Sequence, residues 1–138
     1  MTPLHFACDC GKVDIVELLI NDTQNVNPLK LNTKAAPKEC YYYSTPLHIA
    51  CKKGFNDIVK LLLSNIRTDY NVKTISKPSF PAMDFTPLHF ACMNGFPDIV
   101  KLLLSKPKIN VDSKTGYEGD FFNSLHLASY NGHYEVVE

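Results

Sequence analysis

Apolar residues recur at helical spacing in three stretches of the chain, directly after Gly11, Gly54 and Gly95. Residues three or four positions apart share one face of an α-helix, so this spacing predicts an amphipathic helix in each stretch. The apolar positions are Val13, Ile15, Val16, Leu18 and Leu19 in the first stretch, Ile58, Val59, Leu61 and Leu62 in the second, and Ile99, Val100, Leu102 and Leu103 in the third.

A shorter helix is predicted before each of these stretches. Thr2, Thr45 and Thr86 stand where the hydroxyl of an N-cap residue accepts a hydrogen bond from a free backbone N–H group. Each is followed by a proline, whose missing N–H costs nothing at the first helical position. A glycine after about seven residues is typical of the left-handed residue that ends a helix. Helices this short are marginal alone, so each pair must bury its faces on neighbouring pairs.

The predicted helix pairs belong to an internal repeat. Three segments are near-identical, and a fourth is a looser and incomplete copy that carries Gly132. They are residues 2–20 (TPLHFACDCGKVDIVELLI), 45–63 (TPLHIACKKGFNDIVKLLL), 86–104 (TPLHFACMNGFPDIVKLLL) and 123–138 (NSLHLASYNGHYEVVE). These segments resemble the ankyrin repeat, whose motif includes the Thr-Pro-Leu-His opening.

The resemblance implies an all-α solenoid, in which helix-turn-helix pairs stack and are joined by long hairpin or loop fingers. It predicts a single domain over residues 1–138. The expected repeats are about 1–44, 45–85 and 86–122, followed by a partial repeat at 123–138.

The connections between the helix pairs are longer than the repeat requires. Successive openings at Thr2, Thr45, Thr86 and Asn123 are 43, 41 and 37 positions apart, whereas an ankyrin repeat has about 33 residues. In the first repeat an Asn-Val-Asn sequence occurs at 25–27, the position that the ankyrin pattern gives it. The extra residues are therefore expected after it, in residues 28–44. Prolines in the extensions, at positions 37, 78 and 81, disfavour regular helix there. Insertions in repeats usually map to loops on one face, which is often the binding face.

Charge and cysteine content restrict the partners and the compartment. Lysine plus arginine and aspartate plus glutamate both number 14, and this balance disfavours a phosphate backbone or an anionic membrane surface as the partner. Apolar runs are too short to span a bilayer. Five cysteines without paired-bridge spacing indicate reduced thiols. We therefore predict no nucleic-acid partner, no membrane insertion and an intracellular, cytoplasmic location.

Histidine and cysteine recur one helical turn apart, as in His5 and Cys8, and such a pair could share a metal ion. Stacked repeats lie about 10 Å apart, too far for their side chains to converge on one zinc ion. The resemblance implies instead a hydrogen-bonding role for the histidine and a small apolar site for the cysteine. Cys10 and Cys40 lie outside that site but have no evident catalytic base nearby. The sequence predicts no metal, no cofactor and no enzymatic activity.

Aromatic residues are concentrated in the connections. Two interpretations remain open: the rings pack the fingers onto the stack, or they form a partner-facing patch. They are Tyr41, Tyr42, Tyr43, Phe80, Phe85, Tyr117, Phe121 and Phe122.

The resemblance also implies which positions face a partner. One set lies at the end of each first helix, and a second set directly precedes each helix-opening residue. The first set is Asp9, Cys10, Lys52, Lys53, Met93, Asn94, Tyr130 and Asn131, the second is Ser44, Phe85 and Phe122, and the connector aromatics add Tyr41, Tyr42, Tyr43 and Phe80.

The predicted function is a protein–protein interaction module, such as a scaffold, an adaptor or a regulatory ankyrin domain, with a protein partner. The alternative is the ankyrin recognition segment of a larger multidomain enzyme, such as a kinase, or of a membrane channel or receptor. Both ends of the stack carry apolar residues without a covering repeat, among them Phe6, Val13 and Val16 at the start and Tyr134, Val136 and Val137 at the end. The chain is therefore expected to be a fragment of a longer array and to be prone to self-association.

Overall fold

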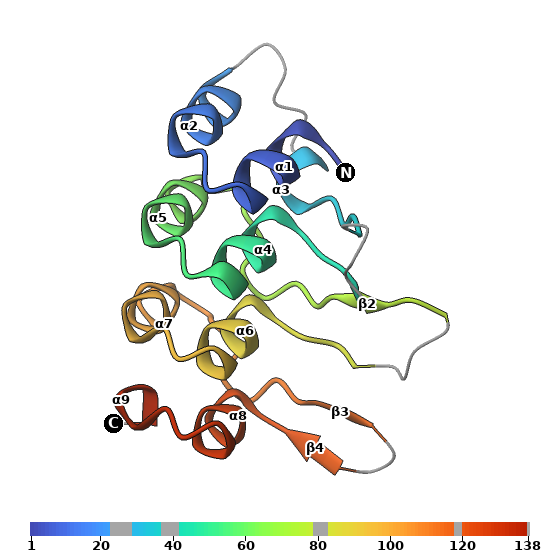
Figure 1. The fold of residues 1–138 in the computed structure, drawn as a ribbon, viewed down its shortest axis with the longest axis vertical. Helices are drawn as coiled ribbons and strands as arrows, with labels where there is room; N and C mark the ends of the chain where they lie inside the picture. Colours follow the sequence, from blue (N-terminus) through green and yellow to red (C-terminus); the bar gives the residue numbers. More distant parts are fainter. Residues whose placement is uncertain (23–28, 37–41, 79–82, 118–119, 138) are drawn as a thin grey trace.

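The computed structural model describes residues 1–22, 29–36, 42–78, 83–117 and 120–137, and it consists of stacked helix pairs with short strands on one side. The inner helices form the middle column of Figure 1, the outer helices lie on one side of it, and the finger strands lie on the other. The inner helices are α1 (Pro3–Asp9), α4 (Pro46–Lys53), α6 (Pro87–Met93) and α8 (Ser124–Tyr130). The outer helices are α2 (Val13–Asn21), α5 (Asn56–Ser64), α7 (Pro97–Leu104) and α9 (Tyr134–Val137). This arrangement confirms the predicted all-α stack.

Each inner helix begins with a reciprocal pair of hydrogen bonds between its N-cap residue and a histidine. At α4 the His48 backbone N–H donates to Thr45 Oγ1 at 3.5 Å, and the Thr45 backbone N–H donates to His48 Nδ1 at 3.1 Å. The same capping box occurs at α1, α6 and α8, where Asn123 replaces threonine at α8. Two orphan donors of each helix start are thus satisfied locally. The predicted caps are confirmed.

The glycine that follows each inner helix is left-handed, as predicted. Gly54 has a φ of 77°, and the ring of Phe96 from the next repeat lies directly over it. A Cβ atom added at Gly54 would come within 2.6 Å of that ring. Glycine is therefore required at this position both for its backbone conformation and for the close approach of the next repeat.

We expect Gly54→Ala to destabilise the protein by about 3 kcal/mol, because the left-handed backbone and the overlap with the ring of Phe96 add their costs. Gly132→Ala is the matched control: Gly132 has a φ of 73° but nothing within 4 Å of an added Cβ. It should lose only the backbone contribution of about 1–2 kcal/mol. Urea unfolding of both variants measures the difference, and equal losses would show that the ring contact is unimportant.

The hydrophobic core lies between the two columns of helices and runs the length of the stack. Apolar side chains of α5 and α7 are buried against the inner helices, including Ile58, Leu62, Ile99 and Leu103. The recurrent cysteine is buried in each of the first three repeats, as at Cys51, which confirms its small apolar site. Each inner helix packs on the inner helix of the next repeat, and α2, α5 and α7 likewise pack in series.

The fingers are joined to one another as well as to the helices. Strand β1 (Tyr42–Tyr43), at the end of the first finger, pairs antiparallel with β2 (Ile75–Ser76), at the start of the second. The second finger is closed at its base by Thr74, whose backbone N–H donates to Phe85 O at 2.8 Å and whose Oγ1 accepts from Phe85 N at 2.9 Å. The third finger is a hairpin of its own, formed by β3 (Thr115–Tyr117) and β4 (Asp120–Phe122).

Two expectations about the first connection are wrong. The Asn32 side chain bonds the backbone of Arg67 and Asp69 in the next repeat, at 2.8 Å in both bonds, and Asn71 makes the same pair of bonds one repeat later at 2.9 and 2.8 Å. Asn32 is therefore the structural equivalent of Asn71, a role that the sequence analysis gave to the Asn-Val-Asn sequence at 25–27, and part of the extension precedes this contact instead of all of it following. Residues 25–27 themselves lie outside the described part of the chain.

One helical turn, α3 (Leu29–Asn32), also interrupts this extension, where the sequence disfavours helix. Leu31 is buried against the core, and Asn32 bonds the following repeat. These tertiary contacts stabilise a helix that its length alone would not support.

Candidate partner-binding surface

The residues at the ends of the inner helices form a continuous feature along the stack, here called the helix-end strip. It consists of Asp9, Cys10, Lys52, Lys53, Met93, Asn94, Tyr130 and Asn131. In α4 the six residues 46–51 are all buried, whereas Lys52 and Lys53 are exposed. Cys10, Tyr130 and Asn131 are exposed as well, and Asp9, Met93 and Asn94 are partly exposed. All eight residues of the first partner-facing set are therefore at least partly accessible to another molecule.

An ion pair orders the strip between the first two repeats. Lys53 Nζ lies 2.8 Å from Asp9 Oδ1 and donates to the Asp9 backbone oxygen at 2.9 Å. Because both side chains are partly exposed, solvent screens the pair and its contribution to stability is small, at most about 1 kcal/mol. Its effect is to hold the ammonium group at a defined place on the strip.

A small hollow of about 40 Å³ lies beside this ion pair. Its walls include Tyr42 from the first finger and Ile49 and Phe90 from successive inner helices. Ile49 and Phe90 were not among the predicted site residues. Ile49 and Phe90 are at the fifth position of their repeat copies, and the other two copies have Phe6 and Leu127 there. Because the flanking residues are nearly the same in every copy, variation at this one position was a sequence signal that could have identified it.

Two predicted partner-facing residues, Ser44 and Phe85, are buried, and for them the prediction is wrong. The backbone of Ser44 exchanges two 2.9 Å hydrogen bonds with Ala35. The ring of Phe85 is only 4% exposed and packs 5.2 Å from the rings of both Tyr42 and Phe90. Ser44 and Phe85 each close the base of a finger and are buried, whereas Phe122, at the equivalent position before α8, is exposed.

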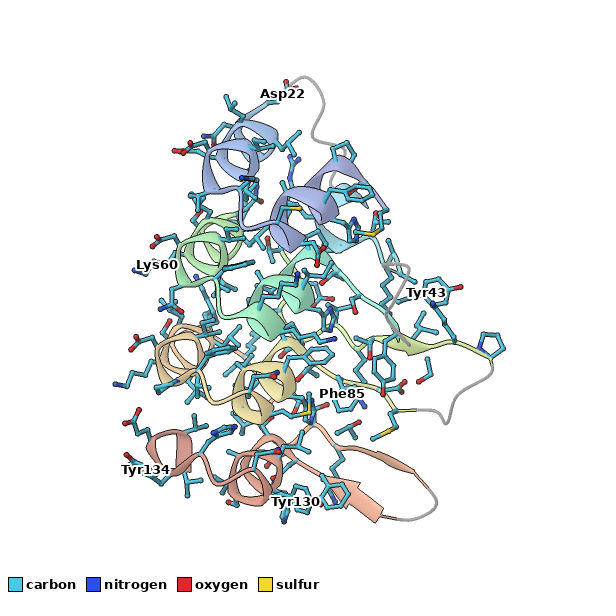
Figure 2. All side chains as sticks on the ribbon, in the orientation of Figure 1. Asp22, Tyr43, Lys60, Phe85, Tyr130 and Tyr134 are labelled. Atoms are coloured by element: carbon cyan, nitrogen blue, oxygen red, sulfur yellow. The ribbon has the colours of Figure 1, made fainter. Side chains whose placement is uncertain are left out.

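The other connector aromatics divide between the two interpretations. Tyr42 packs on Phe85 and its hydroxyl donates to Met83 Sδ at 3.9 Å. Tyr43 and Phe122 are exposed, and Figure 2 shows Tyr43 on the finger side of the stack. Tyr41 and Phe80 lie outside the described residues, as do the side chains of Tyr117 and Phe121. Packing therefore accounts for Tyr42 and Phe85, and exposure leaves Tyr43 and Phe122 as candidates for binding.

The recurrent histidines are structural, as the resemblance implied. Nδ1 of His48 accepts the Thr45 N–H, so Nε2 carries the proton and donates to Phe85 O at 3.0 Å. His89 is held in the same way and donates to Ser113 O at 2.9 Å. Burial lowers the pKa of both rings to about 4, since an imidazolium would lose its hydration. These histidines are neutral at physiological pH.

The buried thiols are unreactive. Burial raises the pKa of Cys8 and Cys92 to about 12 and also raises that of Cys51, which disfavours the nucleophilic thiolate. Among the described residues no three histidine, cysteine or carboxylate side chains are grouped closely enough to hold a metal ion. Within the same residues no helix combines the length and apolar character that a bilayer crossing requires.

Comparison with known proteins agrees with this architecture. A family model described as ankyrin repeats (3 copies) matches residues 1–74, 21–115 and 72–138. A search of the curated proteins finds no match. The matched segments together span the chain, and the structure has the capped helix pairs that the motif requires. The chain belongs to the ankyrin-repeat family, whose repeats generally serve as protein–protein interaction modules.

Proposed function

We propose that this protein holds a protein partner against the helix-end strip, with Tyr43 and Phe122 of the fingers at its margin. The observation that carries the proposal is the pattern of exposure in the inner helices: the bodies of α4 and α6 are buried, and the ends of all four inner helices are at least partly exposed. A solenoid presents such a row to an extended segment or a flat surface of another protein.

The chemistry of the strip indicates the kind of partner. Lys52 adds a positive charge beside the Asp9–Lys53 ion pair, and Met93 offers a soft apolar contact in the next repeat. Tyr130, at the far end, is almost fully exposed, and tyrosine is enriched among the residues that dominate binding energy. A partner with a carboxylate opposite Lys52 and an apolar side chain opposite Tyr130 fits this order. The free, buried thiols support an intracellular setting for the complex.

We expect the double variant Lys52→Glu with Tyr130→Ala to capture about tenfold less partner than the wild type. This reduction corresponds to a loss of about 1.4 kcal/mol of binding free energy. The measurement is affinity capture from cell extract, quantified by mass spectrometry against the wild-type chain. Both substitutions are at exposed positions, so the fold should be unaffected.

The matched control is Lys60→Glu with Ile66→Ala, which changes one exposed lysine and one exposed apolar residue outside the strip. Lys60 is a residue of α5 and lies on the opposite side of the stack from Tyr43 (Figure 2). The control should capture the same proteins in the same amounts as the wild type. If the strip variant also captures them undiminished, the strip is not the binding surface.

A further inference from the structure

The small hollow beside the helix-end strip lies between the first finger and the inner helices α4 and α6. It measures about 40 Å³, and its apolar walls are formed by Tyr42, Ile49 and Phe90. Ile49 and Phe90 are otherwise buried, at 5% and 3% exposed. The wall residues fall within positions 42–90, and helix pairs stand on both sides of that segment. The hollow is therefore a feature of the interior of the stack.

An aromatic cluster behind the hollow holds its walls in place. The ring of Phe85 lies 5.2 Å from the rings of both Tyr42 and Phe90, and the ring of His48 packs edge-on against Phe90 at 5.9 Å. His48 also lines the hollow, but its two nitrogens are already engaged with Thr45 and with the Phe85 backbone oxygen. The hollow is thus preformed, and preorganisation lowers the entropic cost of binding.

The volume of the hollow indicates what can enter it. Sites for free small molecules typically measure about 300–1,000 Å³. A single water-sized probe needs about 10–15 Å³, so a hollow of about 40 Å³ has room for about three non-hydrogen atoms. This is the size of a branched aliphatic side chain such as that of valine. Water against these apolar walls has few hydrogen-bond partners, and its displacement by an apolar group is favourable.

The rim of the hollow carries two ammonium groups and one carboxylate, from Lys52, Lys53 and Asp9. Lys53 and Asp9 pair with each other at 2.8 Å, so the ammonium group of Lys52 gives the rim an excess of positive charge. An occupant that brings a carboxylate to Lys52 is attracted, whereas a basic occupant is repelled. Such charges contribute more to specificity than to affinity.

We propose that the hollow receives a valine-sized aliphatic side chain from an extended segment of the protein partner, and that an aspartate or glutamate two positions along the segment lies against Lys52. Side chains two positions apart share one face of an extended chain. This inference rests on the proposed function and specifies the chemistry of the partner segment that the helix-end strip holds. The aliphatic side chain is the anchor, because the most fully desolvated contacts dominate binding.

A phage-displayed library of random dodecapeptides, selected on the full 138-residue chain, tests the proposal. The enriched peptides should carry a small aliphatic residue with an acidic residue two positions away. A synthetic peptide of the enriched sequence is then titrated by fluorescence anisotropy. Replacing its aliphatic residue by glycine should weaken binding at least about tenfold, which is typical when an apolar group is lost from a fitted pocket. Replacing its acidic residue by the corresponding amide should reduce the salt dependence of binding.

Ile49→Phe tests the same contact from the side of the protein. Phenylalanine occupies the equivalent position in both neighbouring copies, as Phe6 and Phe90, so the repeat accommodates a ring there. The larger side chain should fill the hollow and weaken binding of the wild-type peptide about tenfold, with an unchanged circular dichroism spectrum. Ile66→Phe is the matched control: it makes the same change at a residue that is 99% exposed outside the strip, and it should bind as the wild type does.

Three results would overturn the proposal: enriched peptides that lack the aliphatic and acidic pair, enriched peptides that bind Ile49→Phe as tightly as the wild type, or a selection that enriches nothing over the Ile49→Phe chain. An aromatic residue in place of the aliphatic one counts against it as well, because a ring exceeds the volume of the hollow. The glycine-substituted peptide is measured on the wild-type chain, so the test holds even if Ile49→Phe fails to fold.

Affinity capture from cell extract separates this inference from the proposed function. If Lys52→Glu with Tyr130→Ala loses the captured partner but Ile49→Phe keeps it, the helix-end strip is the binding surface and the hollow is not its anchor site. If both chains keep the partner, the proposed function fails and the inference that rests on it fails too. Loss of the partner by both chains, with Ile66→Phe unaffected, is the expected result.

Discussion

Acidification from about pH 7 to about pH 4 is expected to remove roughly 3 kcal/mol of stability for each of His48 and His89. The folded protein holds both rings neutral, with a pKa of about 4, whereas the ordinary value is 6.5. The unfolded chain therefore takes up protons first as the pH falls. The contribution of the two neutral rings to the free energy of unfolding is fully present above about pH 6.5, declines between about pH 6.5 and 4, and is absent below about pH 4. The combined loss approaches the whole stability of a small domain.

The geometry explains why protonation is unfavourable. Each ring accepts a backbone N–H at Nδ1, from Thr45 or Thr86, and donates from Nε2 to a finger carbonyl. A second proton would have to be placed on Nδ1, against the donor that already points at it. Protonation thus breaks the cap of an inner helix and leaves a buried charge.

Urea unfolding at a series of pH values measures this effect. The midpoint should fall steeply below about pH 6.5, and His48→Gln should flatten the dependence by about half, whatever its effect on stability at neutral pH. Glutamine keeps a hydrogen-bonding side chain but does not titrate. If the wild type and His48→Gln show the same pH dependence, the neutral, buried histidine is not its source.

Phe85→Ala is expected to destabilise the protein by about 3–5 kcal/mol, which is typical for removal of a buried phenylalanine. The ring is 4% exposed and joins the second finger to α6 through Phe90 and to the first finger through Tyr42. Alanine would leave a cavity where three elements meet. Tyr43→Ala, at a ring that is 39% exposed two residues before the α4 cap, should change stability by less than about 0.5 kcal/mol.

Thermal or urea unfolding of both variants measures the contrast. Phe85→Leu serves as a further control, because it retains most of the apolar volume and should recover much of the loss. Equal stability of Phe85→Ala and Tyr43→Ala would mean that the second finger does not contribute to the core. The effect on partner binding should differ from the effect on stability. Tyr43→Ala should reduce the amount of captured partner while leaving the stability of the protein unchanged.

The helical half of each repeat could be predicted because its determinants are local. Thr45, Pro46 and Gly54 start and end α4 through contacts within that helix and with the next turn of chain. The helix-end strip followed from the same motif, since Lys52 and Lys53 are the last residues before the glycine. Membership of the ankyrin-repeat family also followed from these local residues.

The fingers could not be predicted in the same way. Ser44 and Phe85 precede the helix openings in equivalent positions, and the sequence does not distinguish a ring that packs from a ring that faces a partner. Their burial depends on bonds to Ala35 and Thr74 across each finger. The sequence analysis placed the start of the first finger wrongly because the role of Asn32 depends on hydrogen bonds to residues 35 and 37 positions later in the chain.

The sequence by itself determined the helix pairs, their caps, their order in a stack and the family. Those features depend on residues within about one helical turn of each other, where spacing and residue type are sufficient. Only the tertiary structure decided which asparagine joins successive repeats, that β1 pairs with β2 of another finger, and which connector aromatics remain exposed. The physical reason is that these features arise from contacts between repeats, whose partners are separated by the full length of a finger and a helix pair.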